Sequence, residues 1–158
     1  VYIGYAIGTA PITGYNYGAQ NHAELKNIRR KSIKVTLTAG VIMVIIAELL
    51  APVLAGIFVG YDKELFDMTV HAFRLFSFTF LLSGFNIWCS SFFTALNNGA
   101  VSAAVSFLRT LVFQLAAVLI LPIFLKLDGV WISVAFAEVC AFVISLLFLI
   151  AKKKKYDY

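Results

Sequence analysis

Charged residues are scarce in this chain, at 13% of its 158 residues, whereas a soluble domain carries about a quarter. Two cysteines exclude a disulfide framework, and three prolines with ten glycines are too few for a collagen-like or disordered chain. Hydrophobic residues make up 61% of the sequence, and the mean hydropathy is +0.91. That share supplies about 96 apolar residues, enough for four membrane spans of about 20 residues each. The composition therefore excludes a water-soluble fold and predicts an all-α integral membrane protein.

Five apolar runs predict a bundle of about five transmembrane helices, at residues 1–19, 35–59, 75–96, 100–125 and 130–151. The first run begins without a charged flank or a helix cap, so we expect a truncated helix and a chain that is a fragment of a longer protein. Residues 20–34 are predicted to form a polar loop. Because the run 65–96 exceeds one bilayer crossing, its part from Leu65 to Arg74 is predicted to be interfacial.

Positive charge is concentrated in two stretches, 26–34 and 152–155, which hold nine of the thirteen Lys and Arg residues. Both stretches flank apolar runs, which favours membrane topology over nucleic-acid binding. We therefore expect residues 20–34 and the C-terminal tail on the cytoplasmic side, and the turns at 60–67 and 126–129 outside. The tail lysines are interpreted as a topology anchor, with contact to anionic lipids as a second interpretation.

A polar stripe follows the third span at helical intervals of three and four residues. Its members are Thr79, Ser83, Asn86, Ser90, Thr94 and Asn97. One interpretation is hydrogen bonding between helices, and the other is a substrate cavity or water-accessible pathway; the spacing fits both.

The first span carries a similar polar series, Thr9, Thr13, Asn16 and Gln20. Its glycines at 4, 8, 14 and 18 predict close helix packing, while Pro11 and Gly14 are candidates for a hinge. Pro52 in the second span is a further hinge candidate because it removes one helical hydrogen bond.

Three ionisable residues, Glu48, Arg109 and Glu138, fall at membrane depth, where a charge is costly and is a functional candidate by default. Arg109 can reach the interface by extending its side chain. For each glutamate, a structural pairing with a residue of another helix and a role in proton or cation coupling both remain open.

Nothing in the sequence indicates an enzyme or a resident cofactor. His22 and His71 lack cysteine or carboxylate neighbours at ligand spacing, so no metal site is predicted. No serine lies in a nucleophile elbow, and neither cysteine is close to a histidine.

Residues 11–19, Pro-Ile-Thr-Gly-Tyr-Asn-Tyr-Gly-Ala, followed by a basic stretch, resemble a signature of multidrug and toxin extrusion (MATE) transporters. Residues 93–99, the basic Arg109, and Gly129-Val130-Trp131 with Glu138 resemble later motifs of that family in the same order. The resemblance implies the end of helix 8 through helix 12 of a twelve-helix, two-lobe transporter in the inner membrane. Tyr15 and Asn16 then join the stripe as candidates for the substrate pathway.

The resemblance also implies export of organic cations or drugs in exchange for H⁺ or Na⁺. Some members carry a cation-binding aspartate in the tenth helix, but residues 75–97 contain no acid. The chain is therefore more similar to the bacterial DinF-like branch, whose coupling acid lies in the first helix of the missing N-terminal lobe. A flippase for lipid-linked oligosaccharides and a non-transporting membrane subunit are the alternatives. In each transporter interpretation, we expect this segment to be inactive alone.

Overall fold

The computed structural model describes residues 1–158, and every regular element in it is a helix. The elements are α1 (Tyr2–Gly18), α2 (His22–Val59), α3 (Lys63–Ser77), α4 (Thr79–Ala95), α5 (Gly99–Phe107), the π-helical turn η1 (Leu108–Phe113) and α6 (Gln114–Tyr156). Three continuous helical stretches, 22–59, 63–95 and 99–156, are long and apolar enough to cross a membrane. The prediction of an all-α membrane fold is confirmed.

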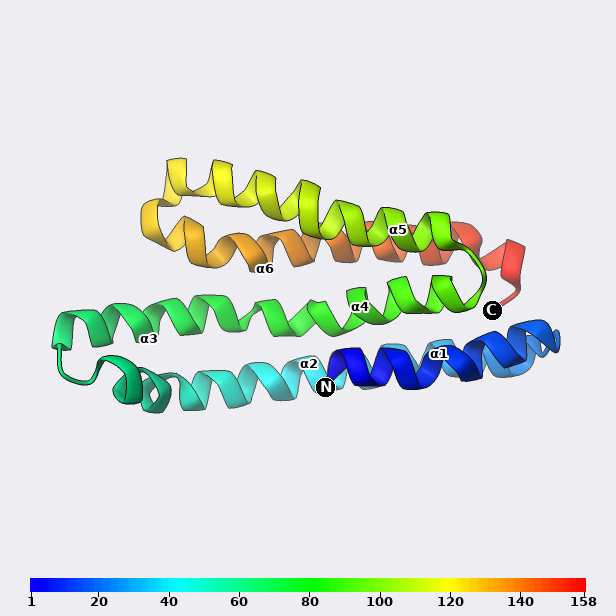
Figure 1. Ribbon diagram of the computed structural model, residues 1–158, viewed down its shortest axis with the longest axis horizontal. Coiled ribbons are helices and arrows are strands. Elements are labelled where there is room, and N and C mark those ends of the chain that lie inside the picture. The colour runs from blue at the N-terminus through cyan, green and yellow to red at the C-terminus, as the bar shows by residue number, and fades with distance from the viewer.

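The longest stretch is a hairpin of two helices and not one rod. Lys126 adopts a left-handed backbone conformation, with φ 53° and ψ −129°, and the chain reverses there (Figure 1). Gly129 lies against the returning backbone, since a Cβ on it would come within 2.5 Å of the Leu121 carbonyl oxygen. This reversal is the turn predicted at 126–129. Four full-length crossings therefore follow α1, whose 17 residues extend for only about 26 Å.

The turns alternate between the two ends of the bundle. The α1–α2 turn, the α4–α5 turn and the C-terminus lie at one end, and the α2–α3 turn and the Lys126 reversal lie at the other (Figure 1). Both basic stretches therefore occur at the same end, as the charge count requires.

One prediction about the connections is wrong. Residues 22–34 are helical and form the first turns of α2, whose N-terminus is capped by Asn21 accepting from the Glu24 amide at 3.2 Å. The charged side chains made this segment resemble a loop, although charge does not prevent helix formation outside the bilayer. Residues 65–74 lie in α3, which continues almost directly into α4 and packs against α2 and α6; their interfacial placement stays a prediction.

Helix α4 is the centre of the bundle and contacts α1, α2, α5 and α6. Its aromatic side chains form most of the buried core, with Trp88, Phe92 and Phe93 each at most 1% exposed. Leu25 of α2 and Leu149 of α6 complete the same cluster from either side. The aromatic faces that surround the polar stripe thus pack mainly against neighbouring helices.

The glycines of α1 do not form the close-packed series that their spacing predicts. A Cβ on Gly14 would lie 3.5 Å from the Ala95 carbonyl oxygen, whereas Gly4, Gly8 and Gly18 have no neighbouring helix within 4 Å in this chain. Both Pro11 and Pro52 lie inside uninterrupted helices.

A close helix approach occurs instead between α2 and α4, at Gly40. A Cβ there would lie 2.5 Å from the backbone oxygen of Leu81, which cannot move without displacing α4. We predict that Gly40→Ala lowers the free energy of unfolding by about 1–3 kcal/mol because the helices must separate. Thermal unfolding in detergent measures this effect. Gly56→Ala is the control in the same helix, since its nearest contact would be an ordinary 3.8 Å; equal loss in both variants would contradict the close approach.

Candidate functional site

A buried ion pair links the last two crossings. Arg109, on η1, donates through Nε to Oε1 of Glu138, on α6, at 2.9 Å. Glu138 is 4% exposed. The pairing corrects the expectation that Arg109 extends toward the interface, and it shows that the partner of Glu138 lies within this chain.

Asn86 of α4 completes the cluster. Its Nδ2 donates to Glu138 Oε2 at 2.7 Å and to the Glu138 backbone carbonyl at 3.0 Å. The glutamate carboxylate is therefore bonded on both oxygens, by a cation on one side and an amide on the other. Such bonding offsets the cost of burying the charge. The amide oxygen of Asn86 is buried and has no hydrogen-bond partner.

A cavity of about 410 Å³ lies beside this cluster. The polar residues that line it are Arg109, Glu138, Thr79, Ser83 and Gln114, and apolar side chains from α1, α2, α3, α4 and α6 complete the wall. The Thr79 hydroxyl oxygen is buried without a hydrogen-bond partner. The cavity thus combines a buried ion pair, hydroxyl and amide side chains and an apolar lining, which are features of a small-molecule site.

The C-terminal part of the polar stripe, Ser90 and Thr94, lies at the interface between α4 and α5. Ser90 bonds to the hydroxyls of Ser102 and Ser106 at 2.9 and 2.8 Å, and Thr94 donates to Ser102 at 2.7 Å. These contacts join α4 to α5 close to their turn. The stripe is therefore divided, with Thr79 and Ser83 at the cavity, Asn86 on Glu138, and Ser90 with Thr94 between helices.

The remaining candidates lie apart from the cavity. Asn16 is buried, donates to the Ile12 carbonyl at 2.9 Å and accepts from Asn21 at 3.1 Å, so it stabilises the α1–α2 turn. Tyr15 is 77% exposed. Glu48 accepts from the Ser77 hydroxyl at 2.6 Å and lies 3.6 Å from Arg74, which joins α2 to α3.

Sequence reasoning did not identify Gln114 or Ser77. Gln114 is a single amide within the apolar run 111–125, and that isolation was the available signal. Ser77 lies just before the stripe, and nothing in the local sequence indicates that it bonds to a glutamate of another helix.

The comparisons with known proteins agree with this architecture. The family model described as MatE matches residues 1–120. The chain belongs to the MatE family. No curated protein matches it.

Solved MATE structures show the same fold as this MatE-family chain. An outward-facing multidrug resistance MATE transporter of the MOP superfamily superposes with a TM-score of 0.89 at 24% identity, over 99% of this chain and 35% of that one. An inward-facing form gives 0.83 at 25% identity, over 97% and 37%. A MATE protein in complex with MaL6 gives 0.81 at 26% identity, over 97% and 36%. The chain therefore spans little more than a third of these transporters, and it is a multi-pass membrane protein with a multidrug-transporter fold.

We predict that the Arg109–Glu138 pair stabilises the bundle only as a pair. Glu138→Gln leaves a buried guanidinium without a counter-charge, and we expect a loss of roughly 3 kcal/mol in the free energy of unfolding. The double variant Arg109→Gln/Glu138→Gln removes both charges and should recover most of that loss. Thermal unfolding in detergent compares the two, and a double variant no more stable than Glu138→Gln would contradict the pairing.

Proposed function

We propose that this chain forms most of the C-terminal lobe of a DinF-like MATE antiporter, from the end of helix 8 through helix 12. The whole transporter exports organic cations or drugs from the cell in exchange for H⁺ or Na⁺. The cavity beside the Arg109–Glu138 pair is the observation that carries the proposal, because it combines polar side chains with an apolar enclosure.

Each part of the cavity suits such a substrate. The Glu138 carboxylate attracts positive charge, the Thr79 and Ser83 hydroxyls can accept or donate hydrogen bonds, and the apolar wall accommodates a hydrophobic body. Arg109 already neutralises the carboxylate in this state. An entering cation would therefore compete with Arg109 for the carboxylate. This competition weakens the binding of the cation, so the cation can be released, as export requires.

Ion coupling is assigned to the N-terminal lobe, the missing partner of this chain. Glu138 and Glu48 are each held by an arginine and a hydrogen-bond donor, an environment that suits a structural charge more than a group that must repeatedly exchange protons. The transporter works without a resident cofactor in this scheme. Neither a flippase nor a non-transporting subunit is favoured by any contact described here.

We predict that Thr79→Val in the full-length transporter lowers export of a cationic dye severalfold without changing thermal stability. The Thr79 hydroxyl has no hydrogen-bond partner in the chain, so removing it should change the stability of the fold little. The substrate, by contrast, should lose one hydrogen bond. Thr36→Val is the matched control, because Thr36 is equally buried but bonds within its own helix at 2.8 Å. Normal export by Thr79→Val would place the substrate elsewhere.

The 158-residue chain alone, in liposomes, should give no drug-dependent ion flux, because alternating access requires two lobes.

The topology can be tested by cysteine labelling in cells that express a variant without Cys89 and Cys140. We predict that Asn27→Cys and Asp157→Cys are protected from an impermeant thiol reagent added outside, since positive charge marks the cytoplasmic end. Tyr61→Cys, at a position that is 84% exposed on the opposite end, should react. The reverse pattern would invert the proposed orientation.

A further inference from the structure

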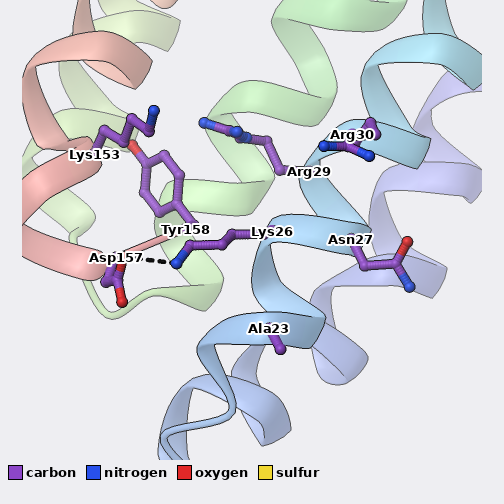
Figure 2. Close-up of a pocket in the computed structure, with 8 residues that line it drawn as sticks. All are labelled: Ala23, Lys26, Asn27, Arg29, Arg30, Lys153, Asp157 and Tyr158. Atoms are coloured by element: carbon purple, nitrogen blue, oxygen red, sulfur yellow. Dashed lines mark ion pairs between the residues drawn. The ribbon is translucent and has the colours of Figure 1, made fainter.

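The basic stretches at the two ends of the chain meet in one pocket. Figure 2 shows Lys26 and Arg29 on the first turns of α2 extending toward Lys153 and Asp157 at the end of α6, and Arg30 also lines the pocket. The pocket measures about 480 Å³, and Tyr158 forms part of its wall. Four cations and one carboxylate therefore surround a space between two helices that are more than a hundred residues apart in sequence.

Most of this positive charge is uncompensated. Lys26 pairs with Asp157 at 2.8 Å, and this hydrogen bond holds the pKa of the Asp157 carboxyl below its ordinary value. Arg29 has no carboxylate partner and lies over the Tyr158 ring, with 5.5 Å from its Cζ to the ring centroid. Arg30 and Lys153 form no ion pair. Guanidinium and ammonium groups gathered in this way form a receptor for phosphate oxygens.

The depth of the pocket matches the lipid headgroup layer. The apolar part of α2 begins at Val35, and a rise of 1.5 Å per residue places Arg30 roughly 8 Å and Lys26 roughly 14 Å beyond it. Lys153 follows the apolar part of α6 by only two residues. Their flexible side chains can reach the headgroup region, which adds about 5–8 Å to each side of the hydrocarbon core.

Apolar surface continues from the pocket toward the membrane. Ile33 and Leu37 lie one and two turns beyond Arg29 and Arg30 on α2, and both are only partly buried against the core. On α6, Ile150 lies one turn before Lys153 and is 63% exposed. This succession of charge and then apolar surface fits an amphiphile better than a soluble phosphate compound.

From these observations we propose that the pocket formed by Lys26, Arg29, Arg30 and Lys153 binds the phosphate headgroup of an anionic phospholipid, whose acyl chains lie along α2 and α6. The bound lipid adds a further connection between the start of α2 and the end of α6, beside the Lys26–Asp157 ion pair. It therefore stabilises this end of the lobe.

The test uses the full-length transporter in a zwitterionic detergent, titrated with short-chain phosphatidylglycerol while thermal unfolding and intrinsic fluorescence are recorded. We expect saturable binding that raises the unfolding temperature. Arg29→Gln/Arg30→Gln should weaken the apparent affinity by at least about tenfold, since each cation near a lipid surface contributes substantially. Lys31→Gln/Lys34→Gln removes the same charge from the same helix outside the pocket and should change affinity less than threefold.

Two further arms separate the possible explanations. Asp157→Asn removes the competing carboxylate and should tighten binding, a gain that misfolding cannot produce. Glycerol phosphate, which has the headgroup chemistry without acyl chains, should not raise the unfolding temperature at equal concentration. The proposal is overturned if both double variants bind equally, if Asp157→Asn weakens binding, or if glycerol phosphate binds as tightly as the lipid.

Discussion

The need to keep a carboxylate charged inside an apolar bundle is the constraint on which the arrangement of the last three crossings depends. Glu138 can remain there because Arg109 and Asn86 reach it from two other helices. Because all three positions must converge, the register of α4, η1 and α6 is set together. The π-helical turn at Leu108–Phe113 carries Arg109 to this point, and such turns often occur where a helix must aim one side chain.

The cavity lies beside this convergence. Thr79, Ser83 and Gln114 line it together with Arg109 and Glu138. Toward the α4–α5 turn, small hydroxyls allow the helices to approach and bond directly through Ser90 and Ser102. The polar stripe of α4 thus has two roles. One part lies at the Glu138 cluster and the cavity, and the other part bonds to the serines of α5.

Several features of the fold could be predicted from local sequence. Long apolar runs specify membrane helices because no other structure satisfies the backbone in lipid. The turn at 126–129 could be predicted from Asp128 and Gly129, and the signature at residues 11–19 indicated the family. An error arose where charge was taken to indicate a loop, as at 22–34. The pairing partners of Glu48 and Glu138 could not be predicted, because each partner lies on another helix, 26 and 29 residues away.

The sequence by itself determined which segments are apolar enough to enter the membrane, that its two basic stretches belong at one end of the bundle, and that three charged residues fall within apolar runs. Those properties depend on hydropathy and charge, which each residue carries regardless of its neighbours. Tertiary structure alone decided that Arg109 neutralises Glu138, that Thr79 retains an unpartnered hydroxyl, and that Arg29 and Lys153 border one pocket. These depend on the distances between helices and on their rotation about their axes, which are set by the packing of the whole bundle and not by any single segment.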